Sequence, residues 1–194
     1  MLFAIGRAPN TEGLVPEKAG VELTEKGLVK TDEHLRTTAD GIWAMGDVCS
    51  RLQFTYTSLD DFRIVKSDVL EDGSYRLSDR KNVPFTTFID PPYAREGLNE
   101  KEAEEEGYSV KVLSAKAATI PKAQLLQKPV GLLKVIVCEE TGKILGAMLF
   151  CEASHEMINL LKLAMDVEAD YTILRDFIYT HPTMSEALNE LLQS

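Results

Sequence analysis

Residues 84–194 are predicted to form an α+β domain in which helices pack on an antiparallel sheet. Two apolar segments, 131–138 and 144–150, flank a turn at 139–143, which is the pattern of a strand–turn–strand hairpin. Apolar residues recur at helical spacing through 154–167 and give that segment a broad apolar surface. Short strands and helices follow one another around the hairpin, and this order favours a layered α+β architecture.

The elements before the hairpin follow from local signals. Residues 85–89 are rich in β-formers and end at an Asp-Pro-Pro sequence, because proline cannot continue a sheet ladder. Asn99 is a good cap for a short helix over 99–106, with Glu102 at capping-box spacing. Gly107 is expected to end that helix.

The remaining elements complete the layers. Residues 109–114 form a further predicted strand. The two hairpin strands lack clean alternation of polar and apolar residues, so both of their faces must be covered, and we expect helices to cover them. These helices are predicted over 154–167, 171–177 and 185–192.

The first 70 residues carry buried-type segments with few neighbours. The apolar runs 2–5 and 42–45 are predicted to be buried strands, and a helix with Ser58 as a loose cap is predicted over 60–70. The polar stretch that follows indicates a domain boundary at 71–84. Buried strands without sheet partners expose apolar faces, so we expect local disorder or rearranged pairing in this region.

Composition limits the partners of the chain. Its 194 residues carry a net charge of −10, and an acidic chain repels nucleic acid and anionic membranes, so neither is expected as a partner. No apolar run reaches the roughly 20 residues that span a bilayer. The N-terminal apolar run is too short for a secretory signal, so a cytoplasmic location is expected. Cys49, Cys138 and Cys151 lie far apart in the sequence, which indicates reduced, mostly buried thiols and neither a disulfide framework nor a metal site.

Two polar constellations could carry chemistry. Gly46 and Asp47 directly follow a predicted strand, which would place a carboxylate at the strand tip, where open α/β sheets bind ligands. His181 lies five residues before Glu186, whose carboxylate could hold one ring nitrogen and set the tautomer of an imidazole that moves a proton near neutral pH. The residues alone favour simpler interpretations, namely a turn aspartate and a loop histidine before a serine- or threonine-capped helix.

Three stretches together resemble one family. They are IGRAPNT at 5–11, TTADGIWAMGDV at 37–48 and HPTMSE at 181–186. In this order and spacing the chain resembles the class I pyridine nucleotide–disulfide oxidoreductases, the family that includes glutathione reductase, lipoamide dehydrogenase and mercuric reductase. Residues 54–65 are similar to a bacterial branch that resists reactive chlorine species or hypothiocyanous acid.

The resemblance implies an organisation for the chain. Residues 1–72 would be a remnant of an FAD-binding α/β domain, formed by the segment that returns to it. Residues 84–194 would be the C-terminal dimerisation domain and would make a homodimer. Gly46 and Asp47 would bind FAD, with the aspartate contacting the ribityl chain.

The resemblance also implies a role for the histidine. His181 would reach across the dimer and exchange a proton with the thiol near the partner's flavin, and Glu186 would orient it. The His181–Pro182 peptide bond would be cis, as in relatives.

The sequence lacks the motifs that carry the redox chemistry of this family. It has no GxGxxG turn for FAD or NAD(P)H and no Cys-x4-Cys dithiol. FAD and NAD(P)H are therefore expected as cofactors of the full-length protein only, with none bound to this chain alone. We expect a fragment of a disulfide oxidoreductase that is inactive alone. The alternative is a stand-alone, non-catalytic dimerisation or interaction module.

Overall fold

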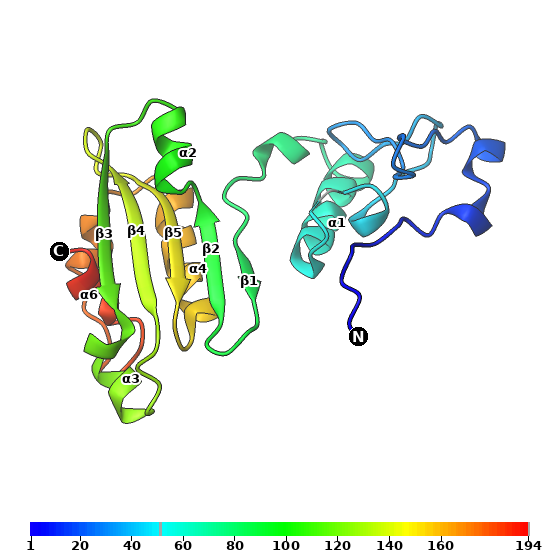
Figure 1. Ribbon diagram of the computed structural model, residues 1–194. Coiled ribbons are helices and arrows are strands. Elements are labelled where there is room, and N and C mark those ends of the chain that lie inside the picture. The colour runs from blue at the N-terminus through cyan, green and yellow to red at the C-terminus, as the bar shows by residue number, and fades with distance from the viewer. Residues whose placement is uncertain (51, 194) are drawn as a thin grey trace. The chain divides into compact units, whose positions relative to one another are not determined.

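The computed structural model describes residues 1–50 and 52–193 of the chain, which divides into two compact units. Unit 1 is Met1–Arg80 and unit 2 is Lys81–Ser194 (Figure 1). Among the described residues, unit 1 contains one α-helix and several short 3₁₀ turns, whereas the strands of the sheet lie in unit 2. Within the same residues, no helix is both long and apolar enough to cross a bilayer.

The sheet of unit 2 has five antiparallel strands in the order β1-β2-β5-β4-β3. Their bounds are β1 Phe85–Thr87, β2 Tyr93–Gly97, β3 Val110–Lys116, β4 Leu132–Cys138 and β5 Ile144–Phe150. The predicted fold class is confirmed. The predicted hairpin is the β4–β5 pair, in which Val135 lies opposite Ala147.

Strand β2 has no counterpart in the sequence prediction. Arg95 and Glu96 interrupt its apolar character, so neither a continuous apolar run nor a simple alternation marks it. The Asp-Pro-Pro sequence looked like the end of strand pairing, but it is the connection between β1 and β2. Its Asp90–Pro91 peptide bond is cis, and pairing resumes at once with Tyr93 opposite Thr87.

The helices of unit 2 are α2 Glu100–Glu105, α3 Pro121–Leu125, α4 Ser154–Asp166, α5 Thr172–Arg175 and α6 Ala187–Leu191. The predicted capping box begins α2. The amide of Glu102 donates to Oδ1 of Asn99 over 2.9 Å, and the amide of Asn99 donates to Oε2 of Glu102 over 2.8 Å. Helix α3 was not predicted, although proline at its first position is a helix-start signal.

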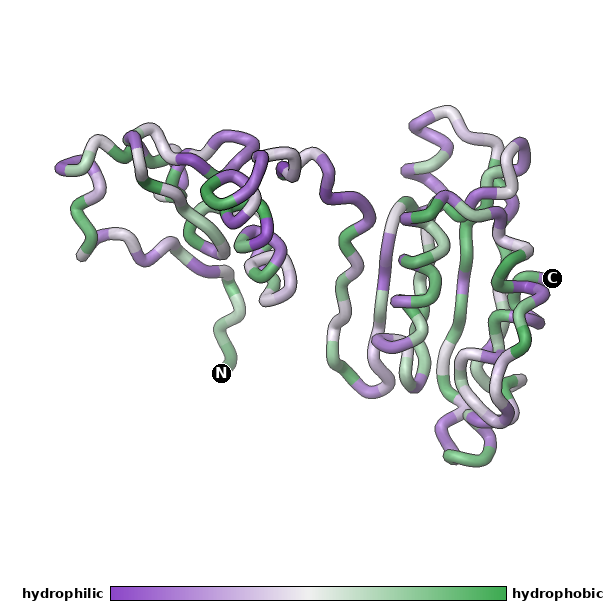
Figure 2. The backbone as a smooth tube through the Cα atoms, turned by 180° about the vertical axis from the view of Figure 1, so that it is seen from behind, coloured by the Kyte–Doolittle hydropathy of each residue, from purple (hydrophilic) through white to green (hydrophobic). Residues whose placement is uncertain are grey.

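Helices α4 and α6 cover one face of the sheet (Figures 1 and 2). Leu133, Val135 and Leu149 of the strands meet Leu161 and Leu188 of the helices there, and all five side chains are fully buried. Burying a leucine side chain stabilises a fold by about 1.5–3 kcal/mol, so this layer is the main source of stability of unit 2.

The opposite face of the sheet is covered only in part. Helix α2 lies over it at one end, where Nζ of Lys134 contacts Oε1 of Glu100 at 2.7 Å. Further along this face, Val112 and Leu132 remain 40% and 45% exposed. The expectation that helices cover both faces therefore holds for one face and is wrong for much of the other.

Unit 1 differs most from its sequence prediction. No strand forms at 2–5, where Leu2, Phe3 and Ile5 are 91%, 72% and 92% exposed. The segment 42–45 is not a strand either, because its pairing is limited to an isolated bridge between Trp43 and Arg36. A strand needs a continuous ladder of backbone partners, and the described part of unit 1 gives 42–45 only a short pairing with 35–37.

Helix α1 spans Thr55–Leu70 and begins earlier than predicted. Its cap position is Phe54, so Ser58 lies inside the helix and is not its cap. The buried face of α1 is largely polar and contains Thr57, Asp61 and Ser67, with Ile64 as its apolar member. Its exposed side chains include large apolar residues, Leu59, Phe62, Val69 and Leu70. The helix is thus inverted relative to an ordinary surface helix, which buries its apolar face.

Candidate functional site

The predicted contact between His181 and Glu186 is present in unit 2. Nδ1 of His181 lies 2.7 Å from Oε2 of Glu186. A carboxylate only accepts hydrogen bonds, so Nδ1 carries the proton and Nε2 holds the lone pair when the ring is neutral. The histidine side chain is 69% exposed and the glutamate side chain is 17% exposed. The carboxylate of Glu186 therefore holds the ring at Nδ1, while most of the imidazole remains exposed.

The same carboxylate also shapes the loop. Oε1 of Glu186 accepts the amide N–H of Thr183 at 3.0 Å, and Oγ1 of Thr183 accepts the amide N–H of Glu186 at 3.3 Å. This reciprocal pair has the pattern of a capping box and lies in the turn just before α6. Met184 is 6% exposed and packs into the core, which fixes the loop from the other side. The His181–Pro182 bond is cis, as predicted.

The charge on Glu186 follows from these contacts. The hydrogen bond with His181 and the amide of Thr183 hold the pKa of the Glu186 carboxyl below its ordinary value. The carboxylate is therefore ionised at neutral pH. An ionised carboxylate at Nδ1 holds the orientation and the tautomer of the ring, which suits a group that exchanges a proton at Nε2.

The second predicted site pair lies in unit 1. Gly46 has a φ of +75°, and a Cβ there would lie 2.7 Å from Oγ of Ser58. Its amide N–H donates to Oδ2 of Asp61 over 2.7 Å. Asp47 follows with a side chain that is 53% exposed, and Arg7 lies 3.4 Å from its Oδ2. The turn follows an extended segment and not the predicted strand.

The Gly46–Asp47 turn has two features that could bind a polyhydroxyl chain. A glycine leaves the backbone bare, and the exposed carboxylate of Asp47 can accept hydrogen bonds from hydroxyl groups. The bare backbone and the exposed carboxylate are groups that could contact the hydroxyls of the ribityl chain that the resemblance implies. The two predicted pairs, His181 with Glu186 and Gly46 with Asp47, belong to different units.

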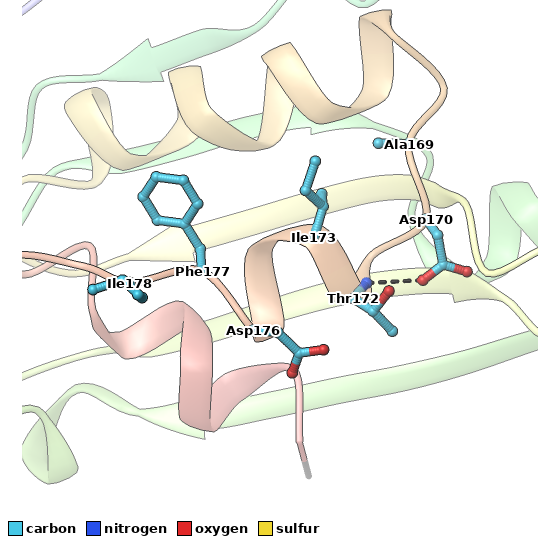
Figure 3. Close-up of a pocket in the computed structure, with 7 residues that line it drawn as sticks. All are labelled: Ala169, Asp170, Thr172, Ile173, Asp176, Phe177 and Ile178. Atoms are coloured by element: carbon cyan, nitrogen blue, oxygen red, sulfur yellow. Dashed lines mark hydrogen bonds between the residues drawn. The ribbon is translucent and has the colours of Figure 1, made fainter.

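An open pocket of about 640 Å³ lies in unit 2, close in sequence to His181. Figure 3 shows Ile173 and Phe177 beside it, with Asp170 accepting the amide N–H of Thr172 at 2.9 Å. Ile173, Phe177 and Ile178 are 54%, 55% and 92% exposed. We call these three side chains the α5 apolar patch. Sequence reasoning assigned this segment to a helix and did not mark it as a surface feature.

No disulfide joins Cys49, Cys138 and Cys151; Cys138 and Cys151 are buried and Cys49 is partly buried, which agrees with the prediction of mostly buried thiols. Burial raises the pKa of Cys49 to about 11 and that of Cys151 to about 12. Both thiols therefore stay protonated and are poor nucleophiles at neutral pH. No group of three or more histidine, cysteine or acidic side chains within residues 1–50 and 52–193 could hold a metal ion.

Sequence reasoning missed the burial of several carboxyl groups, including the side chain of Asp68 in α1, which is 2% exposed. Asp61 is fully buried in α1, and Glu96 is 1% exposed in β2. An Asp-Asp pair in a polar helix resembles an ordinary solvated face, so the sequence contains no signal for Asp61. Glu96 belonged to a strand that was itself not predicted.

Two family descriptions match the chain. The dimerisation domain of pyridine nucleotide-disulphide oxidoreductases matches residues 83–192, and the domain described as pyridine nucleotide-disulphide oxidoreductase matches residues 1–61. The chain is 50% identical over 191 residues to the probable pyridine nucleotide-disulfide oxidoreductase RclA of Escherichia coli, in a match that covers 98% of this chain and 43% of that protein. It is 34% identical over 190 residues to dihydrolipoyl dehydrogenase of Mycobacterium tuberculosis, covering 98% and 41%.

A solved structure of RclA has the same fold over this region. The HOCl-induced flavoprotein disulfide reductase RclA from Escherichia coli superposes with a TM-score of 0.96 at 49% identity, covering 98% of this chain and 44% of that chain. The chain thus spans less than half the length of the relatives it matches.

Proposed function

The chain belongs to the pyridine nucleotide–disulfide oxidoreductase family, and from that premise we propose that it is part of a longer, cytoplasmic FAD- and NAD(P)H-dependent disulfide oxidoreductase. In this proposal the chain supplies the dimer interface and an acid–base pair, and it is inactive alone. The observation that carries the proposal is the exposed ring of His181, held at Nδ1 by the buttressed carboxylate of Glu186.

The acid–base step assigns one role to each residue. Nε2 of His181 accepts the proton of a thiol on the partner subunit, and the resulting thiolate attacks a disulfide substrate. The same nitrogen then returns the proton to the departing thiolate sulfur. Glu186 keeps the ring in the tautomer that this exchange needs. Bound FAD and NAD(P)H supply the electrons that renew the thiol.

In unit 1, Gly46 and Asp47 would hold the ribityl chain of FAD. The outward apolar side chains support this proposal, since Leu59 and Phe62 on α1 and the apolar run 2–5 are exposed. In the longer protein, the rest of the FAD-binding domain would cover these side chains, because a soluble protein rarely exposes a contiguous apolar surface.

The α5 apolar patch supports self-association. It lies within a few residues of His181 in the sequence, and a histidine that serves the partner's thiol must sit at a subunit boundary. A second copy that covers Phe177 and Ile178 would therefore also meet His181. Apolar and aromatic side chains are the usual anchors of such interfaces.

A charge in this patch is expected to disrupt the dimer. Ile178→Asp should raise the dimer dissociation constant by about 30-fold or more, because it buries a charge at an apolar contact. The side chain is 92% exposed, so the fold of unit 2 should survive. Sedimentation equilibrium measures the change. The matched control is Leu125→Asp on α3, which is 68% exposed and outside the patch, and an equal effect of both variants would contradict the assignment.

The first test is the intact mass and absorbance spectrum of the gene product purified from its native cells. A yellow protein of more than twice 21.6 kDa is expected, since the chain covers 43% of its relative RclA. The 194-residue chain alone should then show no NAD(P)H oxidation with added FAD. A colourless protein of about 21.6 kDa would instead support a stand-alone dimerisation or interaction module.

A further inference from the structure

We propose that Asp61 is a positioning residue that, together with Arg80, holds the Gly46–Asp47 turn in the conformation that binds FAD. This inference rests on the proposed function, because it deepens the assignment of the turn to the ribityl chain. Asp61 acts through the backbone of Gly46 and needs no contact with the cofactor.

The contacts of Asp61 use both of its oxygens. Its Oδ2 accepts the amide N–H of Gly46 at 2.7 Å, and its Oδ1 forms an ion pair with Nη2 of Arg80. Nε of Arg80 also contacts Oδ2 of Asp60 at 2.6 Å, and that carboxylate accepts the hydroxyl of Tyr75 at 3.0 Å. The side chain of Asp61 is fully buried, while that of Arg80 is 11% exposed.

Burial makes this arrangement selective for one backbone conformation. A buried carboxylate is costly unless each oxygen has a partner, so Asp61 needs both Arg80 and the Gly46 amide. A hydrogen bond to a charged acceptor is also about twice as strong as a neutral one. The turn is therefore attached to α1 at the residue immediately before Asp47.

Helix α1 also limits the turn sterically. Ser58 and Asp61 lie three residues apart and share one face of the helix. Gly46 sits against both, and a Cβ there would lie 2.7 Å from Oγ of Ser58, so the serine side chain would have to shift. Its positive φ and its bound amide fix the direction in which the backbone enters Asp47. A loosened anchor would let the carboxylate of Asp47 sample other directions, which lowers affinity without removing a ligand group.

The same helix provides a matched control. Asp68 lies seven residues after Asp61, and its side chain is 2% exposed. It pairs with Arg36 and accepts Nε1–H of Trp43 at 2.9 Å. Asp68 therefore anchors a different loop of unit 1 through the same kind of bonds, and it does not contact Gly46.

The test compares the two anchors in the natural FAD-loaded gene product that contains this segment. Asp61→Ala is expected to raise the dissociation constant of FAD by about tenfold or more and to shift the visible flavin spectrum, since about 1.4 kcal/mol corresponds to tenfold. Asp68→Ala should lower the melting temperature by about as much as Asp61→Ala does, because both variants remove a buried anchor of unit 1. It should change FAD affinity by less than about threefold. Asp61→Asn should lie between wild type and Asp61→Ala, because its carbonyl oxygen can still accept from Gly46.

Two outcomes would count against the proposal. Equal losses of FAD affinity for the Asp61 and Asp68 variants would show general destabilisation, and unchanged affinity for Asp61→Ala would remove the positioning role. If Asp61→Ala does not fold, Asp61→Asn against Asp68→Asn decides in the same way. Asp47→Ala distinguishes a failure of the proposed FAD site from a failure of the positioning role of Asp61. If Asp47→Ala weakens FAD binding and the Asp61 variants do not, only the positioning role fails. If wild type binds no FAD, the proposed function fails first.

Discussion

Replacing His181 by alanine is expected to lower the turnover of the complete flavoprotein by about 100- to 10,000-fold, the usual contribution of a general acid–base group. The loss should fall on the reaction with the disulfide substrate. Reduction of the flavin by NAD(P)H should proceed at the wild-type rate, because in the proposed mechanism His181 serves the thiol and not the nicotinamide. Stopped-flow measurement of the two half-reactions checks this separation.

Two further variants sharpen the test of the histidine. Glu186→Gln should cost less than His181→Ala, yet it should not be neutral. The amide has one accepting oxygen, whereas the carboxylate accepts both Nδ1–H of His181 and the amide N–H of Thr183. His155→Ala in α4 is the control and should keep full turnover. Slowed flavin reduction in His181→Ala, or equal losses in His155→Ala, would contradict the acid–base role.

The free energy of unfolding is expected to fall as the pH rises from about 5 to 8, and Glu96 should be the cause. Glu96 is 1% exposed, and neither of its oxygens has a hydrogen-bond partner within the described part of the chain. Burial raises the pKa of its carboxyl to about 8, with Asp166 adding to the rise and Lys162 opposing it. The folded state therefore keeps a proton that the unfolded state releases near its ordinary value of 4.5.

Proton linkage gives the direction in which the free energy of unfolding changes with pH. Between these two pKa values the native state binds more protons than the unfolded state, so stability decreases with pH in this window. The expected loss is of the order of 2–5 kcal/mol, because each pKa unit corresponds to about 1.4 kcal/mol. Urea unfolding at pH 5, 6, 7 and 8 measures it. Glu96→Gln should flatten this dependence, and parallel curves for the variant and wild type would assign the slope to other groups.

The sequence predicted unit 2 far better than unit 1 for a physical reason. The β4–β5 hairpin and the capping box of Asn99 depend on local patterns that also stabilise them locally. Segments such as 2–5 and 42–45 have the composition of buried strands, but in the described part of the chain 2–5 forms no strand and 42–45 makes only a short pairing with 35–37. Their composition fits a sheet that the described residues of unit 1 do not form, and apolar composition alone does not reveal a missing neighbour.

The candidate site shows the same division. The contact between His181 and Glu186 spans five residues and follows from a local motif. The anchor of Gly46 spans fifteen residues and joins a loop to the middle of a helix. The hydrophobic pattern of α1 does not identify Asp61 as buried, because Thr57 and Ser67 on the same buried face are also polar. Only the folded backbone brings its carboxylate to the amide of Gly46.

The inverted α1 helix has a consequence for biosynthesis. In the longer protein that we propose, the remainder of the FAD-binding domain lies nearer the N-terminus and leaves the ribosome first, and domains generally fold as they emerge. When α1 emerges, the part of the FAD-binding domain that would cover Leu59 and Phe62 would already be folded. These side chains would then be buried soon after they leave the ribosome. A ribosome that starts internally at this segment would instead release an apolar helix with nothing to cover it, and such a product is a natural substrate for chaperones and proteases.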